Sequence, residues 1–346
     1  MPAIESGKVL VSGANGYIAV WVVKTLLDRG FTVRGTVRAE SKGAHLRTLF
    51  ADAGDKLELV VVEDITVPGA FDAAVQGVDA ILHTASPFHF HADDPAELIT
   101  PAVAGTTGIL ASAAAHAGPR LQRVVVTSSC AAVLTPGDAS GRAFAEADWN
   151  EASVRAVEAA GRAAPPAEKY RASKTLAERA AWAAHAALLG AGAVDWDLVV
   201  LNPPFVFGPV LHEVRDAVGL NESARDWYES VVKGAKTTEQ LATVGSSYVD
   251  VRDLALAHVL ALQKQDAAGQ RIIVSAGPFN WQNWVTIAHK LYPEIQEGDT
   301  SYDPEKATYA IRYVPDKERE LLKTPFRSME ETTKDILDDF KAKGWL

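Results

Sequence analysis

Short apolar runs alternate with longer segments of helical periodicity through the first two thirds of the chain. The runs are rich in β-branched residues and almost continuously hydrophobic, which is typical of strands buried on both faces. We expect strands at 9–11, 32–37, 57–62, 80–83, 124–127, 198–201 and 272–275. Apolar residues that recur every three or four positions predict helices at 18–28, 102–117, 168–189 and 254–264. This alternation predicts an α/β fold built on a doubly wound parallel sheet, as in Rossmann domains.

The segments 208–241 and 277–346 lack this alternation and carry tryptophan, proline and mixed charge. We expect them to form a smaller, discontinuous α/β lobe over the carboxyl edge of the sheet, where it would bind substrate. Residues 1–207 and 242–276 would then form the Rossmann domain. The alanine-rich tract 152–167 predicts a loop, with Pro165 and Pro166 as the break before the next helix.

Composition and charge indicate which partners the protein could bind and where in the cell it is expected. The formal net charge of −10 argues against a nucleic-acid or anionic-membrane surface. The apolar run 180–194 is interrupted by His185 and is too short to span a membrane. A strand-like run begins at Lys8, which leaves no room for a signal peptide, and the single cysteine, Cys130, allows no internal disulfide. We therefore expect a cytoplasmic protein.

A glycine-rich turn follows the first strand and opens the first helix. It reads Ser12-Gly13-Ala14-Asn15-Gly16-Tyr17-Ile18-Ala19. Gly13 and Gly16 allow a tight turn and a close approach of the backbone to a pyrophosphate, which the helix N-terminus would attract. Such a turn also occurs in other α/β folds. Its place after the first strand of a βα series favours dinucleotide binding.

Three side chains suggest proton transfer at a carbonyl. Tyr170 and Lys174 are one helical turn apart, and an ammonium near a phenol would lower the phenol pKa. Taken alone, the pair also fits an ordinary amphipathic helix surface. Ser129 ends the fifth strand, where open α/β sheets bind ligands, although it could equally be an N-cap serine. The order of glycine turn, serine and Tyr-x-x-x-Lys makes chance an unsatisfactory explanation.

With these motifs the chain resembles the extended short-chain dehydrogenases/reductases. It is most similar to their dihydroflavonol-reductase-like branch, and there to fungal NADPH-dependent methylglyoxal, aldehyde and ketone reductases. The resemblance covers nearly the whole chain and includes the segments 11–16, 82–88, 126–129, 170–174, 202–209 and 249–253. It implies that Tyr170 protonates the developing alkoxide and Ser129 hydrogen-bonds the carbonyl oxygen. Lys174 would hold the ribose hydroxyls and tune Tyr170.

The resemblance also implies further cofactor and substrate contacts. Asp64 and Ile65 would lie near adenine, Thr84 and Ala85 along the diphosphate and ribose, and Pro203 and Val206 near the carboxamide. Ser223 matches a serine on the phosphate side. The implied substrate pocket is lined by Phe88, Phe90, Cys130 and Phe205. Fungal relatives often carry tyrosines at the positions of Cys130 and Phe205, so this pocket would be less polar and roomier beside Ser129.

The second strand predicts the choice of cofactor. NAD-selective enzymes of this fold place an acid near its end, and that acid would repel a 2′-phosphate. Here Arg38 and Lys42 follow the strand, and both positions match those that hold the 2′-phosphate in NADPH-dependent relatives. Glu40 is the counter-evidence, and we expect its side chain to point to solvent. The sequence thus predicts NADPH/NADP+ as the cofactor.

Three other interpretations account for parts of the sequence. His89 and His91 with Asp93 and Asp94 suggest a metal site, but no further ligand cluster completes it, and we expect no metal. A nucleotide-sugar epimerase or dehydratase would be consistent with the fold. Dehydratases usually place acidic residues beside the hydroxyl that ends the fifth strand, and residues 128–132 include none. A non-catalytic NADP-sensing regulator would commonly have lost the tyrosine. We expect a small carbonyl substrate, no nucleic-acid or membrane partner, and a monomer or homodimer.

Overall fold

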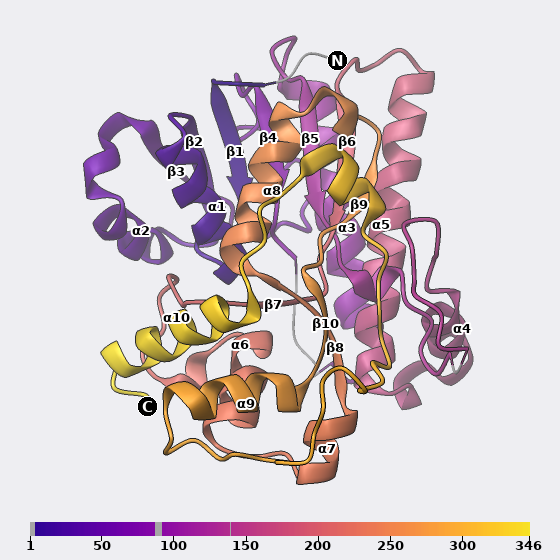
Figure 1. The fold of residues 1–346 in the computed structure, drawn as a ribbon. Helices are drawn as coiled ribbons and strands as arrows, with labels where there is room; N and C mark the ends of the chain where they lie inside the picture. Colours follow the sequence, from indigo (N-terminus) through magenta and orange to yellow (C-terminus); the bar gives the residue numbers. More distant parts are fainter. Residues whose placement is uncertain (1–3, 87–91, 139) are drawn as a thin grey trace.

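The computed structural model describes residues 4–86, 92–138 and 140–346. Seven parallel strands form the main sheet in the order β3-β2-β1-β4-β5-β6-β9 (Figure 1). Their bounds are β1 Lys8–Ser12, β2 Thr32–Val37, β3 Leu57–Val61, β4 Ala80–His83, β5 Arg123–Thr127, β6 Asp197–Asn202 and β9 Arg271–Ile273. The order reverses between β1 and β4, so ligands are expected at the carboxyl ends of these two strands. The predicted doubly wound parallel sheet is confirmed.

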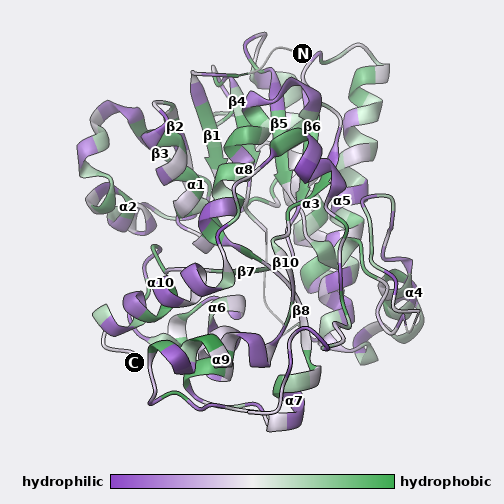
Figure 2. Cartoon of the chain, in the orientation of Figure 1, coloured by the Kyte–Doolittle hydropathy of each residue, from purple (hydrophilic) through white to green (hydrophobic). Residues whose placement is uncertain are grey.

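Helices cover both faces of this sheet. On one face α1 (Tyr17–Asp28) packs beside α8 (Val251–Gln263). On the other, α3 (Ala96–His116) packs beside α5 (Pro166–Gly190). Near β2 and β3 lies the short helix α2 (Ala44–Leu49). Figure 2 shows hydrophobic residues gathered on the central strands, as expected for strands covered on both sides.

By length and composition alone, α3 could span a membrane. Within the fold it is a core helix, because its residues Ile109, Leu110 and Ala113 pack in the cluster beneath the sheet. Pro101 lies inside this helix. The amphipathic pattern predicted a start at residue 102, so the first turn and a half were missed.

The alanine-rich tract 152–167 was wrongly predicted to be a loop. Residues Glu151–Ala160 form α4, and the helix begins at Asn150, whose side chain accepts a hydrogen bond from the Ser153 N–H at 3.0 Å. Val154 and Val157 form its buried face. Alanine has the highest helix propensity, and an asparagine cap is the start signal that the composition obscured.

A three-stranded sheet in the order β10-β8-β7 builds the smaller lobe. Its strands are β7 Phe205–Phe207, β8 Gly245–Asp250 and β10 Gly277–Asn280; its helices are α6 Glu222–Trp227, α7 Thr238–Thr243, α9 Trp281–Leu291 and α10 Met329–Ala342. Buried aromatic rings form its core, with Phe207, Phe279 and Trp284 within 6 Å of one another. Although the expected division assigns 242–276 to the larger domain, β8 pairs with strands of the smaller one. The domain boundaries remain a prediction.

Candidate active site

The glycine turn lies between β1 and α1 at the point where the strand order reverses. Gly13 has φ of +65°, and a Cβ there would lie 3.1 Å from the Ala85 Cβ. Gly16 is the N-cap of α1 and offers no capping side chain, so the first N–H groups of the helix are open to an anion. The turn therefore has the close-approach backbone and the free amide donors that a pyrophosphate needs.

Another glycine, on the neighbouring strand β2, allows that strand to pack closely against the turn. A Cβ at Gly35 of β2 would lie 2.7 Å from the Ala14 Cβ and 3.0 Å from Leu59 Cδ2. Thr36 accepts a hydrogen bond from the Gly13 N–H at 3.0 Å through its side chain. Sequence reasoning missed Gly35, although a lone glycine inside a strand pattern signals close backbone approach.

The residues on either side of Gly16 contact different parts of the fold. The Tyr17 hydroxyl donates to the Gly208 carbonyl at 3.0 Å, and burial raises the pKa of Tyr17 well above its usual value. Its side chain thus contacts the segment after β7. Asn15 and Ile18 are half-buried beside it.

Arg38 and Lys42 lie beyond the end of β2. Arg38 is exposed and Lys42 is half-buried in the short 3₁₀ turn Glu40–Gly43. The Glu40 carboxylate is exposed and pairs with Arg47 at 2.5 Å. Its negative charge is thus matched by Arg47. The exposure of Glu40 agrees with the expectation that it points to solvent, and the binding of a 2′-phosphate by Arg38 and Lys42 remains a prediction.

The end of β4 is fixed by Ser12. The Ser12 Oγ accepts from the Thr84 N–H and the Ala85 N–H, each at 3.0 Å, and lies 2.9 Å from His83 Nδ1. Because both hydroxyl acceptor positions are used, Ser12 donates its proton to Nδ1, and the His83 proton is on Nε2. Burial lowers the pKa of His83 to about 3, so the imidazole is neutral. The Thr84 hydroxyl bonds the Ser12 carbonyl, which holds Thr84 and Ala85 against the glycine turn.

Ser129 and Tyr170 meet above the sheet. Ser129 follows β5, and its hydroxyl accepts the Ala131 N–H at 3.1 Å, so it is indeed a cap residue. It is also hydrogen-bonded to the Tyr170 side chain. Ser129 is therefore an N-cap residue whose side chain also contacts Tyr170, and its catalytic role remains a prediction.

Burial raises the pKa of Tyr170 to about 12, and the hydrogen bond with Ser129 offsets part of this rise. The overall shift is upward, opposite to the lowering that the sequence predicted, and Lys174 is not among its causes. The Lys174 ammonium lies 5.8 Å from the centre of the Tyr170 ring, and loss of hydration of the phenolate is the larger effect. Tyr170 is consequently protonated throughout the neutral range.

Lys174 is buried one turn further along α5. Its Nζ donates to the Ser86 hydroxyl at 2.8 Å, and burial lowers its pKa to about 8. It lines a cavity of about 10 Å³, the size of one water molecule, together with His83 and Glu178. Sequence reasoning missed Ser86, His83 and Glu178. The position of Glu178, four residues after Lys174 on the same helix face, could have revealed it.

The predicted substrate-binding residues differ in how far their side chains are exposed. Phe88 and Phe90 lie outside the described residues. The Phe205 ring is 37% exposed and stacks on Phe207 at 5.7 Å. Cys130 is 2% exposed, and its thiol donates to the Asn202 carbonyl at 3.2 Å. It packs in a small cluster behind Ser129, so its thiol presents almost no surface to a ligand here.

The residues expected near adenine and the carboxamide lie at two places around the sheet edge. Asp64 is exposed beyond the end of β3, where its carboxylate accepts from the Thr66 N–H at 2.8 Å, and Ile65 packs against α3. The carbonyl of Pro203 accepts the Cys130 N–H at 2.9 Å, and Val206 is buried in β7. Ser223, on α6, accepts a hydrogen bond from the side chain of Asn221 at 2.9 Å. Their contacts with a cofactor remain predictions.

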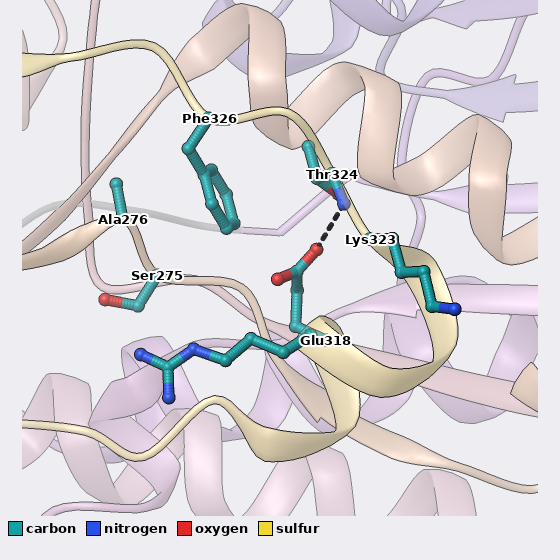
Figure 3. Close-up of a pocket in the computed structure, with 7 residues that line it drawn as sticks. Ser275, Ala276, Glu318, Lys323, Thr324 and Phe326 are labelled. Carbon is teal, nitrogen blue, oxygen red and sulfur yellow. Dashed lines mark hydrogen bonds between the residues drawn. The ribbon is translucent and has the colours of Figure 1, made fainter.

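A separate pocket of about 360 Å³ lies at the end of β9 (Figure 3). Its lining residues are Ser275, Ala276, Glu318, Arg319, Lys323, Thr324 and Phe326. The Glu318 carboxylate accepts the Thr324 N–H at 2.7 Å, and burial raises the pKa of Glu318. None of the expected site residues lines this pocket.

Within the described ranges 4–86, 92–138 and 140–346, no group of three His, Cys, Asp or Glu residues could hold a metal ion. His89 and His91 fall outside those ranges. Asp93 and Asp94 instead face the Arg162 guanidinium, at 3.4 and 3.1 Å.

Residues 9–277 match the NAD dependent epimerase/dehydratase family. The chain belongs to this family. Its relatives include ketoreductase azaE of Aspergillus niger, which is 35% identical over 95% of this chain and 96% of that protein. The NADPH-dependent methylglyoxal reductase GRE2 of Saccharomyces cerevisiae is 33% identical over 94% and 96%. The predicted resemblance to extended short-chain dehydrogenases/reductases is confirmed.

Solved structures of family members agree with this assignment. The crystal structure of Gre2 from Candida albicans in complex with NADPH matches with a TM-score of 0.83 at 34% identity, covering 97% of this chain and 99% of that one. Vestitone reductase from alfalfa matches with a TM-score of 0.77 at 27% identity. The family fold therefore extends over both lobes.

Proposed function

We propose that this protein is an NADPH-dependent carbonyl reductase that reduces an aldehyde or ketone to an alcohol. The observation that carries the proposal is the hydrogen-bonded pair of Ser129 and Tyr170, with Lys174 one turn away. Relatives that match over nearly the whole length of the chain are named as ketone and methylglyoxal reductases. Cytoplasmic location and a monomeric or homodimeric state remain expectations.

The described residues suit a nicotinamide dinucleotide phosphate. The Gly13 and Gly16 turn and the amide groups of α1 would hold the pyrophosphate, since Gly13 adopts the positive φ of the tight turn and Gly16 puts no capping side chain on the first N–H groups of the helix. Arg38 and Lys42 would hold the 2′-phosphate, and Lys174 the ribose hydroxyls. When bound, the cofactor supplies the hydride that reduces the carbonyl carbon.

The chain's own residues supply the acid chemistry. Ser129 donates a hydrogen bond to the substrate oxygen and orients it. Tyr170, with its pKa near 12, is fully protonated at neutral pH and donates its proton to the oxygen as negative charge develops there. The Lys174 ammonium favours the phenolate that remains. A raised tyrosine pKa suits reduction, because the residue must begin the reaction as an acid.

The substrate side is apolar. Phe205 offers an exposed ring near the end of β7, and we propose with it Phe88, Phe90 and Cys130 as the wall for hydrophobic or aromatic carbonyl compounds. The buried thiol of Cys130 limits its part to shaping the wall behind Ser129.

The epimerase or dehydratase alternative rests on the name of the family. It is less well supported, because the residues after Ser129 are Cys130, Ala131 and Ala132, and none of them is an acid. The regulatory alternative requires no catalytic tyrosine, yet here Tyr170 is hydrogen-bonded to Ser129.

Replacing Tyr170 tests the proposal. With NADPH and a panel of small aldehydes and aryl ketones, Tyr170→Phe is expected to lower kcat by about 10²-fold or more, because the proton donor is lost. Its affinity for NADPH, followed by the change in cofactor fluorescence, should stay within about twofold of the parent.

Tyr228→Phe is the matched control, since this buried tyrosine donates its hydroxyl to the Trp345 carbonyl within the smaller lobe. It should leave kcat unchanged. Turnover of Tyr170→Phe within about tenfold of the parent would refute Tyr170 as the acid.

A further inference from the structure

Glu178 shares a helix face with the two predicted catalytic residues of α5. It lies one turn beyond Lys174 and two turns beyond Tyr170. Its side chain is almost completely buried, at 1% exposure. A carboxylate removed from water must have each oxygen paired, so the partners of Glu178 show what it holds.

Two of the three partners of one carboxylate oxygen belong to the strand ends around Ser129. The Ser128 hydroxyl donates to Glu178 Oε2 at 2.6 Å, and Asn202 Nδ2 donates to the same oxygen at 2.7 Å. The same Asn202 amide also donates to the Ser129 carbonyl at 3.1 Å. Glu178 therefore joins α5 to the ends of β5 and β6, on either side of Ser129.

The other carboxylate oxygen is held by Arg271 of β9. Arg271 Nε donates to Glu178 Oε1 at 2.5 Å, and its guanidinium lies 3.8 Å from the centre of the Trp149 ring. Its Nη1 donates to the Glu146 carbonyl at 2.8 Å. These additional contacts hold the arginine, which also reaches the oxygen shared by Ser128 and Asn202 through its Nη2 at 3.4 Å.

We propose that Glu178 is a positioning residue for carbonyl reduction. Through Ser128, Asn202 and Arg271, together named the Glu178 network, it sets the separation between the hydroxyls of Ser129 and Tyr170. This inference rests on the proposed function of those two residues. Catalytic groups must be held within about 0.5 Å of the productive geometry, and a displacement of about 1 Å can cost about 10²-fold in rate.

The chain contains a matched buried ion pair that lacks this geometry. Arg123 and Asp197 join the same two strands, β5 and β6, at their opposite ends, with Nε–Oδ1 at 2.6 Å and Nη2–Oδ2 at 2.8 Å. Both residues are buried. We expect loss of this pair to disturb the sheet at the starts of β5 and β6, remote from Ser129.

The test compares Glu178→Gln, Ser128→Ala and Asp197→Asn in the full chain. We expect Glu178→Gln to lower kcat by about 10- to 100-fold while the Kd for NADPH stays within about twofold. Ser128→Ala, which leaves the buried ion pair intact, should lower kcat by about 3- to 10-fold. The combined variant should lose less than the product of the two, because both act through one network. Asp197→Asn should lower the Tm without changing kcat.

Crystal structures of the parent, Glu178→Gln and Asp197→Asn add a readout that needs no substrate. The separation of Ser129 Oγ from Tyr170 Oη should grow by about 0.5 Å or more only in Glu178→Gln. If Glu178→Gln does not fold, Ser128→Ala decides by the same two measurements.

Unchanged kcat and unchanged separation in the folded variants would overturn the positioning role. A parent without carbonyl turnover would instead refute the proposed function. In that case the hydroxyl separation alone would decide whether Glu178 positions Ser129.

Discussion

At the scale of single residues, the charge of Lys174 should control the pH dependence. Its pKa of about 8 lies below the usual lysine value because burial disfavours the ammonium. The side chain is therefore charged below pH 8 and neutral above it. Tyr170 stays protonated up to about pH 12 and adds no change in that range.

We expect kcat/KM for carbonyl reduction to be level below pH 8 and to fall about tenfold per pH unit above it. Lys174→Arg should move this fall to higher pH, because a guanidinium keeps its charge. The measurement is a pH–rate profile from pH 6 to 10 with saturating NADPH. A level profile through pH 9 in the parent would contradict the assignment.

Arg38 should decide between NADPH and NADH. Arg38→Ala is expected to weaken NADPH binding by about 1.5–3 kcal/mol, the value of a hydrogen bond to a charged group, and to leave NADH binding almost unchanged. Isothermal titration calorimetry measures both affinities. Arg29→Ala is the control. Arg29 lies at the C-terminus of α1, the end away from the glycine turn, so its loss removes the same charge and should leave both affinities unchanged. Equal catalytic efficiency of the parent with the two cofactors would refute the prediction.

At the scale of elements, the contact between β2 and the glycine turn allows a sharp test. Gly35→Ala would place a Cβ 2.7 Å from Ala14 Cβ, so the strand and the turn must separate. We expect the Kd for NADPH to rise by about tenfold or more, as a small displacement disturbs every phosphate contact of the turn.

Gly190→Ala is the control, because a Cβ at this glycine of α5 meets no described atom within 4 Å. Its affinity for NADPH and its Tm should match those of the parent. An unchanged Kd in Gly35→Ala would show that the turn tolerates the displacement.

Elements with strong local patterns were predictable from the sequence. The predicted strand 32–37 is β2 itself, and 57–62 differs from β3 by one residue, because buried parallel strands form continuous apolar runs. The alanine-rich tract that became α4 and the three-stranded sheet were not predicted. β7, β8 and β10 come from three distant segments, and their pairing depends on tertiary packing that no local pattern encodes.

The site could be predicted only where its residues form a motif. Ser129, Tyr170 and Lys174 follow a recognisable spacing, whereas Gly35, Ser86 and His83 act through contacts between distant strands. The pKa of Tyr170 also escaped prediction, since the loss of hydration depends on the buried surroundings of the phenol.

At the scale of the whole molecule, polar contacts join the two lobes. Asp250, fully buried at the end of β8, pairs with Arg252 at 2.7 Å and accepts the Thr332 hydroxyl of α10 at 2.8 Å. Arg252 also reaches Asp335 of α10 at 2.5 Å. The last helix is thus fastened to the start of α8.

Removing one of these contacts should lower the stability of the molecule. Thr332→Val keeps the shape of the side chain but leaves a buried carboxylate oxygen short of a donor, so we expect a loss of about 1–3 kcal/mol in the free energy of unfolding. Thr333→Val, whose hydroxyl bonds the Met329 carbonyl of its own helix, should cost less. Urea denaturation of both variants checks the order, and equal losses would refute the role of the Asp250 contact.

The pairing of Glu178 with Arg271 also has a consequence during protein synthesis. The carboxylate is made more than ninety residues before the arginine that neutralises it, and β9 is the last strand to join the sheet. A ribosome adds about 5–20 residues per second, so the nascent chain carries Glu178 for several seconds without its cation. Until Arg271 emerges, that acid cannot be buried without a large cost, and water must remain around the ends of β5 and β6. We therefore expect a nascent chain released before β9 to hold every predicted catalytic residue but to lack the buried Glu178 network beside Ser129.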